Sequence, residues 1–372
     1  MRNILFVVPH VPMFDTNAGD WRTYCLCRIL AKRYNVFLLP RRYSWNDDGY
    51  EKKIEKCGIK IVCPGKNSSK RFEKFINENR IETVIFRSFY MLSMLEKHLP
   101  LIRNIIIDTQ ELHYEKEARC IKAKFKKANI ELKKILNSRK TEEIKYLEKA
   151  DVLIAISEVD AKKLRKMFPS KRIAIIPLAC DTPGKALIYP PYEARKDIVF
   201  FGFFEKGNPN NDAVSHFIRD ILPLVRQRIP GIRFNIVGSG ANVFKGAGNS
   251  VCTKESIKNI SSELSKCRVF VCPLRFGAGV KKKVLDSMIS RTPVVSTNIG
   301  IEGISVISGK EVLVADSPAE FANKVIGLYQ NRNLWDKVSS GGYSKINRFY
   351  SEKAVEKQVK MYYDIFETRK AN

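Results

Sequence analysis

The 372-residue sequence lacks several features that would place it in a specialised class. It has no run of 18 or more apolar residues, so we expect no transmembrane helix. The apolar stretch at residues 4–8 is too short for the core of a secretory signal peptide. There is no Asp-x-Asp motif, and the four histidines are too dispersed for a zinc motif. We therefore expect neither a membrane span nor a metal centre.

The nine cysteines show no pattern of a disulfide framework. Their number is odd, and Cys25 and Cys27 do not have the Cys-x-x-Cys spacing of a metal or redox pair. Scattered free cysteines are typical of a reducing compartment. The sequence therefore predicts a cytoplasmic protein.

Acidic residues are scarce: 39 stand against 66 lysines and arginines, which gives a formal net charge of +27. Such a charge favours polyanionic partners, either nucleic acid or an anionic membrane surface. No zinc-finger, RRM or glycine-aromatic RNA motif accompanies it, so we do not expect a nucleic-acid partner. A lysine-rich proteome is the alternative source of the same excess.

Residues 119–136 concentrate this charge on a segment with helical periodicity. Lysines fill the positions between apolar residues that recur at helical spacing, namely Ile121, Phe125, Ala128, Leu132 and Ile135. A basic amphipathic helix of this kind can lie on an anionic leaflet, which would place the protein at the inner membrane face. The alternative is a helix that packs on the core and leaves its lysines solvated.

Short, continuously apolar segments alternate with helical material along the chain. They lie at 4–8, 35–40, 59–63, 82–88, 104–110, 151–157 and 172–181, and then at 197–202, 233–238, 268–274, 292–297 and 311–316. This alternation is typical of doubly wound parallel sheets, and the length exceeds one ordinary core. We predict two Rossmann-like domains at 1–183 and 197–345, a Pro-rich linker at 184–196 and a helical tail at 346–372.

The segment from Cys272 to Gly303 carries the strongest functional signal. A loop with Gly277 and Gly279 leads into a helix, and four bases surround the junction: Arg275, Lys281, Lys282 and Lys283. A helix start offers backbone N–H groups and a positive dipole end, and lysines add full charges, so this place should attract phosphate. Asp286, near the helix start, is suited to bridge sugar hydroxyls. Phosphate and a diol together describe a nucleotide-sugar.

This segment resembles the donor-binding segment of family-four glycosyltransferases with the GT-B fold, in the branch with G-x-G-x-K-x-K-x-x-E-A-M-x-x-G-x-P-V-V. Asp286 stands where that pattern has Glu, and Arg291 where it has Gly. DIVFFGFFEKGNPNNDAV, FNIVGSG and ADVLIAISEVDAKKL also resemble family segments, in the family's order. The matches to the donor pattern itself are Gly277, Gly279, Lys281, Lys283, Met288, Pro293, Val294 and Val295.

The resemblance implies an acceptor-side domain and a donor-side domain that face each other across a cleft, with the C-terminal helix crossing back to the first. It also implies transfer of a sugar from a nucleotide-sugar donor to a saccharide or lipid-linked acceptor in surface-polysaccharide assembly. The transfer is expected to be retaining and to need no metal or other cofactor, because fixed cations and helix dipoles can stabilise a leaving diphosphate.

On the donor side, we assign the diphosphate to Lys281 or Lys283 and the ribose to Asp286. Arg275 is a further phosphate candidate, and Glu302 is placed near the donor sugar. Solvated lysines and simple turn geometry are the alternatives. The remaining predicted donor contacts are Gly277, Ala278, Gly279, Val280, Gly202, Phe203 and Gly238.

In the first domain, Gly19 and Arg22 resemble the family's G-x-x-x-R loop. IIIDTQELH resembles D-T-x-D-L-H, so Asp108, Glu111 and His113 match with one Glu-for-Asp change. The resemblance implies that a residue here orients the sugar or receives the acceptor proton. Alternatively, these polar loop residues only cap the start of a helix and have no part in the reaction. We therefore assign catalytic roles to Glu111, His113 and Lys283. Gly19, Arg22 and Asp108 are expected to line the cleft on the acceptor side. An acid before the next strand is also expected there, either Glu142 or its neighbour Glu143, and we prefer Glu142.

Two rival hypotheses keep the fold and change the function. Asp286, Ala278 and Gln110 depart from family patterns, which would suit a catalytically decayed scaffold that binds anionic membrane or nucleic acid. The second rival is a nucleotide-sugar epimerase that acts on the donor without an acceptor.

Overall fold

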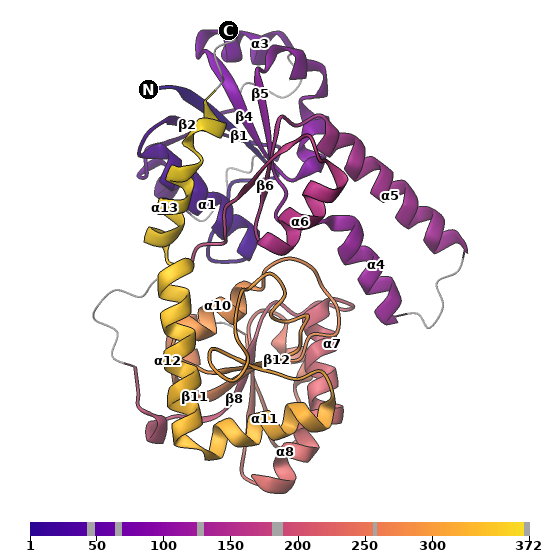
Figure 1. Ribbon diagram of the computed structural model, residues 1–372, viewed down its shortest axis with the longest axis vertical. Helices are drawn as coiled ribbons and strands as arrows, with labels where there is room; N and C mark the ends of the chain where they lie inside the picture. The colour runs from indigo at the N-terminus through magenta and orange to yellow at the C-terminus, as the bar shows by residue number, and fades with distance from the viewer. Residues whose placement is uncertain (43–48, 64–68, 125–129, 181–188, 256–258, 368–372) are drawn as a thin grey trace. The chain divides into compact units, whose positions relative to one another are not determined.

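A computed structural model describes residues 1–42, 49–63, 69–124, 130–180, 189–255 and 259–367. The chain divides by its contacts into two compact units (Figure 1). The first unit comprises 1–117, 128–179 and 355–372, and the second comprises 118–127 and 180–354. The predicted linker begins among residues 181–188, which lie outside the described part of the chain.

The first unit is built on a seven-stranded parallel sheet with strand order β3-β2-β1-β4-β5-β6-β7. Nearly every strand is a short apolar run, because a parallel sheet that is covered on both faces buries the side chains of both faces. The strands are β1 (Asn3–Val8), β2 (Asn35–Pro40), β3 (Ile59–Ile61), β4 (Ile81–Arg87), β5 (Asn104–Asp108), β6 (Val152–Ala155) and β7 (Arg172–Ile175).

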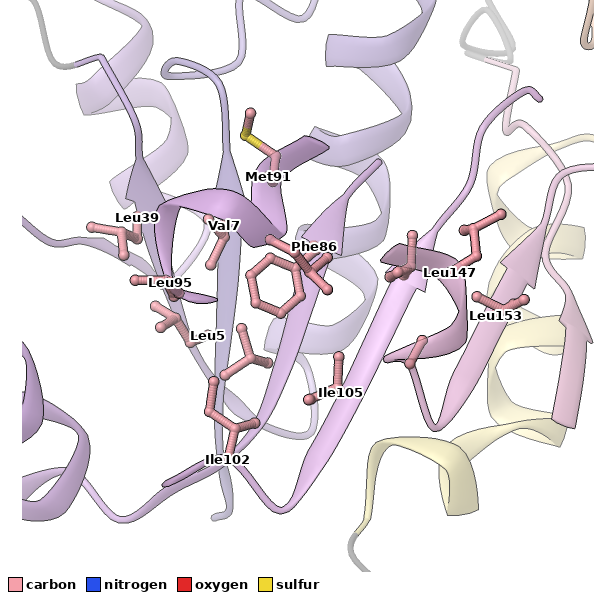
Figure 2. Close-up of a cluster of buried hydrophobic side chains, with 14 of the residues drawn as sticks. Leu5, Val7, Leu39, Phe86, Met91, Leu95, Ile102, Ile105, Leu147 and Leu153 are labelled. Atoms are coloured by element: carbon pink, nitrogen blue, oxygen red, sulfur yellow. The ribbon is translucent and has the colours of Figure 1, made fainter. Parts of the chain in front are cut away.

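One core of the first unit lies against a face of this sheet. Figure 2 shows Leu5 and Val7 of β1, Phe86 of β4, Ile105 of β5 and Leu153 of β6 among its side chains. Helices of this unit are α1 (Ala18–Ala31), α2 (Tyr50–Glu55), α3 (Ser69–Glu78), α4 (His113–Lys124), α5 (Ile130–Glu148), α6 (Glu158–Met167) and α13 (Glu352–Met361), with 3₁₀ turns at Phe89–Met94, Glu96–Leu101 and Tyr363–Phe366. The second half of α4 and the start of α13 group with the second unit.

The C-terminal segment of the first unit is hydrogen-bonded to the rest of that unit. Lys32, just after α1, donates to Glu356 of α13 over 2.5 Å. Asn104, at the amino end of β5, donates from its side-chain amide to the carbonyl of Ile365 over 2.8 Å. These contacts join the C-terminal segment to the amino-terminal edge of the sheet, so the carboxyl edge stays clear of them.

The second unit has a six-stranded parallel sheet with strand order β10-β9-β8-β11-β12-β13. Its strands are β8 (Lys196–Phe201), β9 (Phe234–Val237), β10 (Val251–Lys254), β11 (Cys267–Cys272), β12 (Val294–Ser296) and β13 (Leu313–Val314). The strand β10 was not predicted, because VCTK is short and half polar. The helices are α7 (Pro209–His216), α8 (Leu222–Arg228), α9 (Ile260–Lys266), α10 (Lys282–Ile289), α11 (Pro318–Gln330) and α12 (Arg332–Phe349), and a π-helical turn at Phe217–Ile221 joins α7 to α8.

The predicted basic helix over 119–136 falls on the end of α4 and the start of α5. Residues 125–129, between them, lie outside the described part of the chain. At the start of α5, Ile130 and Ile135 are 75% and 43% exposed. None of the helices in the described residues is both long enough and apolar enough to cross a membrane.

Candidate functional site

Lys283 lies in the first turn of α10, and its ammonium group contacts the carboxyl end of β8. Its Nζ lies 2.5 Å from Oδ1 of Asn210, in α7, and 4.3 Å from the centre of the Phe200 ring. Gly202 follows β8 directly, and a Cβ atom there would lie 2.8 Å from that Nζ. The absence of a side chain at Gly202 therefore leaves the space that the Lys283 ammonium group occupies. Burial lowers the pKa of Lys283 to about 8.

Arg275 and Lys281 are engaged by carboxylates. Arg275 makes a two-point ion pair with Asp212 of α7, with Nε 2.9 Å from Oδ2. Lys281 folds back over its own loop, donates to the carbonyl of Gly279 over 2.7 Å and lies 3.6 Å from Glu302. Its side chain is buried. The structure thus brings Lys281 and Glu302 together, but Glu302 is bonded more closely to Arg119 of α4, whose guanidinium lies 2.5 and 2.8 Å from its two carboxylate oxygens.

Asp286, the predicted ribose ligand, is paired with Lys282 one helical turn earlier. The Nζ atom of Lys282 lies 2.7 and 2.8 Å from the two carboxylate oxygens. Asp286 is 6% exposed, and burial raises the pKa of its carboxyl group above the ordinary value. Of the four clustered bases, Lys283 is therefore the one whose contacts within the described residues are all with uncharged groups.

The loop after β8 is organised by Asn208, which belongs to the polar run 205–208 expected to lie over the phosphates or sugar, and by Asn210, which the sequence-based assignment did not include. Asn208 caps α7 by accepting from the N–H of Asn211 over 2.8 Å. Asn208 and Asn210 each donate from the side-chain amide to the carbonyl of Phe203 over 2.8 Å. The Phe203 side chain itself is 54% exposed. The P-N-N sequence after the glycine turn was the available signal, since asparagine is a frequent helix cap.

The predicted glycines serve close backbone packing. Gly238 has φ +126°, and a Cβ atom there would lie 2.0 Å from the carbonyl oxygen of Gly202. The turns after β8 and β9 therefore pack backbone against backbone, which only glycine allows. Gly277 and Gly279 also have positive φ, 140° and 66°. Ala278 and Val280 lie in the loop that these two glycines shape.

In the first unit, Arg22 and Asp108 form a buried ion pair. Nη2 of Arg22 lies 2.7 Å from Oδ1 of Asp108, and Nε lies 2.9 Å from Oδ2. Arg22 also donates to the carbonyl of Ile176 over 2.7 Å. Arg22 and Asp108 are each 3% exposed. The two predicted residues are brought together, and they tie α1 to β5 and to the segment after β7.

Asp20 is the centre of a polar cluster that sequence reasoning missed. Its buried carboxylate accepts from Nε2 of His10 over 2.9 Å and from the amide of Asn17 over 3.0 Å, and it pairs with Arg87 at the end of β4. Burial alone would raise the pKa of Asp20, but His10 and Arg87 hold it below the ordinary value. Gly19 leaves room for this cluster, because the Arg87 guanidinium occupies the place of its missing Cβ.

Glu111 and Glu143 act on the start of α4. Lys116, in the first turns of that helix, donates to Glu111 over 2.6 Å. Glu143 accepts from the backbone N–H groups of His113 and Tyr114 over 3.0 and 2.9 Å. Burial raises the pKa of Glu143 to about 7. Glu142 is exposed, so Glu143 is the buried acid of this pair.

His113 is the first residue of α4, and its Nε2 lies 2.9 Å from Oγ of Ser88. The rings of Phe89 and Tyr90 stand edge-on to the imidazole at 5.5 and 5.7 Å between centres. Burial lowers the pKa of His113, so the neutral ring is favoured. Within the described residues, no group of three or more His, Cys, Asp or Glu side chains is arranged to hold a metal ion.

Residues 195–331 match the sequence profile of the family described as glycosyl transferases group 1. That range contains β8, α7, the glycine loop and α10. A curated relative, an uncharacterized 44.6 kDa protein in the cps region of Klebsiella pneumoniae, is 27% identical over 159 residues. The match spans 40% of this chain and 41% of that protein.

Solved structures share the architecture along nearly the whole chain. Sucrose-phosphate synthase from Thermosynechococcus elongatus has a TM-score of 0.72 at 14% identity and covers 98% of both chains. Anabaena HepE in complex with UDP and glucose has a TM-score of 0.68 at 11% identity and covers 98% of this chain and 100% of its own. A variant of S. aureus TarM in complex with Fondaparinux, alpha-GlcNAc-glycerol and UDP has a TM-score of 0.69 at 12% identity, with 99% and 100% covered. With the two parallel sheets, these likenesses confirm the predicted GT-B fold.

Proposed function

We propose that this protein is a glycosyltransferase that moves a sugar from a nucleotide-sugar to a saccharide or lipid-linked acceptor. The family match over residues 195–331 supports the reaction class. The single observation that carries the proposal is the environment of Lys283. Its ammonium lies at the carboxyl end of β8 beside Gly202, where ligands of doubly wound sheets bind, and its contacts there are neutral.

In the proposed reaction, a nucleoside diphosphate leaves the donor sugar at this site. The bond between the anomeric carbon and the phosphate oxygen breaks, and the diphosphate leaves with the electron pair. The acceptor hydroxyl oxygen bonds to the anomeric carbon, and its proton passes to the departing phosphate oxygen on the same face, so the configuration is retained. Lys283 and the first N–H groups of α10 would stabilise the growing negative charge. A ligand phosphate can share Lys283 with Asn210 without breaking an ion pair.

Donor and acceptor classes are proposed from the neighbours. HepE is described in complexes with UDP, glucose and UDP-glucose, and TarM in a complex with UDP and alpha-GlcNAc-glycerol. We therefore propose a UDP-sugar as the first donor to test and a glycan as the acceptor. The likeness to a protein of a cps region supports a role in surface-polysaccharide assembly. The proposed reaction needs no metal ion, because Lys283 supplies the cation.

We further propose that the start of α5 contacts an anionic membrane surface. Ile130 and Ile135 are exposed large apolar side chains, and Lys133 and Lys134 between them are exposed as well. Apolar side chains beside lysines are the composition of a surface helix that binds anionic lipid. This would bring the enzyme to a lipid-linked acceptor at the inner membrane face.

A donor screen tests the proposal directly. Purified protein is heated with UDP-, GDP-, ADP- and CMP-sugars, and a donor that binds raises the unfolding midpoint by mass action. The stabilising sugar is then incubated with and without acceptor, and the products are separated. Transfer only with acceptor supports the proposal. Isomerised or hydrolysed donor without acceptor identifies the epimerase, and no binding to any nucleotide-sugar identifies the decayed scaffold.

A further inference from the structure

Ser88 has a backbone conformation that costs free energy. It directly follows β4, with φ 72° and ψ 159°, a region that glycine occupies and a residue with a Cβ atom avoids. Such strain costs about 1–3 kcal/mol and persists only where the surroundings impose it. The backbone of Ser88 is held on both sides: its N–H donates to the carbonyl of Asp108 over 3.0 Å, and its carbonyl accepts from Met91 over 3.4 Å.

The strained conformation brings the hydroxyl of Ser88 to the imidazole of His113. Oγ lies 2.9 Å from Nε2, and Ser88 is 3% exposed. A glycine here would relax the backbone and lose this contact. The presence of serine at a position that suits glycine therefore indicates that the hydroxyl has a role.

The direction of the hydrogen bond between Ser88 and His113 depends on the tautomer of the imidazole. A buried hydroxyl needs an acceptor for its proton, and within the described residues Oγ of Ser88 is hydrogen-bonded to Nε2 of His113. If Oγ–H donates to Nε2, a neutral imidazole carries its own proton on Nδ1. Nδ1 has no recorded hydrogen-bond partner among the described residues. His113 would then present a donor to a ligand, and not a base.

We propose that Ser88 is a positioning residue that holds His113 as the Nδ1–H tautomer, so that His113 donates a hydrogen bond to an oxygen of the bound saccharide. This role rests on the proposed glycosyl transfer, and it replaces the alternative that His113 receives the acceptor proton. Phe89 and Tyr90, edge-on to the ring, restrict its rotation. The charged groups around the ring are Glu111, Lys116 and Glu117 at the start of α4 and Glu143 of α5.

The tautomer can be measured without any assay of transfer. The chain has four histidines, so ¹⁵N-histidine labelling gives few signals, and His113→Gln identifies those of His113. At neutral pH, the wild-type protein should show an unprotonated Nε2 and a protonated Nδ1. In Ser88→Ala the Nε2–H tautomer, which free imidazole side chains prefer, should gain population. A protonated Nε2 in the wild type, or an unchanged spectrum in Ser88→Ala, would overturn the assignment.

Two substitutions separate positioning from a structural role. Ser88→Gly removes both the hydroxyl and the strain, and Ser88→Ala removes the hydroxyl and keeps the strain. We expect both to lower kcat for transfer about tenfold, the value of one hydrogen bond, at unchanged donor KM. Ser88→Gly should unfold at a higher temperature than Ser88→Ala. Ser93→Ala, in the 3₁₀ turn that follows Ser88, is the matched control and should keep full activity. Full activity in Ser88→Gly would contradict the proposal. If no variant or wild type transfers sugar, the spectra still decide the tautomer, and only the proposed function fails.

Discussion

The Nζ atom of Lys283 lies 2.5 Å from Oδ1 of Asn210, so the ammonium group is held by a neutral amide. Its sequence neighbour Lys282 is instead paired with Asp286, and Lys281 lies 3.6 Å from Glu302, a carboxylate that it shares with Arg119. In the described part of the chain, a phosphate that approaches the glycine loop therefore meets in Lys283 a cation that no carboxylate contacts.

Replacing Lys283 should slow transfer strongly and leave the fold intact. We expect Lys283→Ala to lower kcat by about 10²–10³, as loss of one charge-stabilising donor does elsewhere. The unfolding midpoint should not fall, because removal of a partly buried charge relieves a desolvation cost. Lys266→Ala, at an exposed lysine of the same unit, is the control. Initial rates with saturating acceptor measure the effect, and a Lys283→Ala enzyme within twofold of wild type would exclude the assigned role.

Donor binding should weaken as pH rises through about 8, the value to which burial lowers the pKa of Lys283. Below that pH the ammonium is charged and can bind phosphate; above it, affinity should fall by about tenfold per pH unit. The stability of the folded protein should change in the opposite direction to donor affinity. Because the pKa in the folded state lies below the ordinary 10.5, the free energy of unfolding should rise between pH 8 and that value. Calorimetric titration of donor from pH 6 to pH 10 checks the first trend, and a pH-independent affinity would contradict it.

Glu143 and Glu142 form a matched pair for testing the cap on α4. Glu143→Ala leaves two backbone N–H groups without their acceptor and should cost about 1–2 kcal/mol of unfolding free energy. Glu142→Ala, at the exposed neighbour, should change it by less than about 0.5 kcal/mol. Urea unfolding monitored by circular dichroism measures both. Equal effects of the two substitutions would show that the cap does not stabilise the helix.

Because its pKa is raised, Glu143 should also make the stability of the protein decrease as the pH rises. Between 4.5, the ordinary value, and about 7, the folded state holds a proton that the unfolded chain has released. The contribution of this group to stability is therefore largest in acid and is lost as pH rises through about 7. Glu143→Gln should remove this step from a plot of unfolding free energy against pH. A step of unchanged size in the variant would assign it to another group.

The ion pair of Arg22 and Asp108 should be needed for folding. Removing either partner leaves the other charge buried, so Arg22→Ala or Asp108→Ala should cost about 3–5 kcal/mol. Arg103→Ala removes one partner of an exposed ion pair in the same unit and should cost less than about 1 kcal/mol. Urea midpoints report the difference. Activity lost in an Asp108 variant that unfolds as the wild type does would instead point to a direct role in the reaction.

Vesicle binding tests the exposed start of α5. Ile130→Ser combined with Ile135→Ser should lower partitioning onto anionic vesicles about tenfold or more, because apolar area is no longer buried in lipid. Leu101→Ser, at a 44% exposed apolar residue of the same unit, is the control. Sedimentation with anionic and with zwitterionic vesicles supplies the measurement. Equal binding to both vesicle types, or no effect of the double substitution, would remove the membrane contact from the proposal.

The fold was largely predictable because it depends on local patterns. Nearly every strand is a short apolar run, and the runs alternate with helical periods, which determines a parallel α/β architecture. The strand β10 was not predicted, because its sequence, VCTK, contains no apolar run. The glycine loop with its lysines was visible for the same reason: its residues are consecutive.

The candidate site was predictable only in its location. Consecutive residues at a helix start point about 100° apart, so Lys281, Lys282 and Lys283 meet different neighbours although the sequence presents them as one charged run. The same rotation separates the exposed Glu142 from the buried Glu143. No pattern in the sequence distinguishes these positions.

The amino-acid sequence by itself therefore determined the two doubly wound domains and the stretch where phosphate is expected, because both follow from the order of neighbouring residues. Tertiary structure alone decided which charges remain available. It paired Arg22 with Asp108 and brought Ser88 against His113, each across a long stretch of chain. Such pairs depend on how strands align in the sheet, and that alignment reflects the packing of the whole domain.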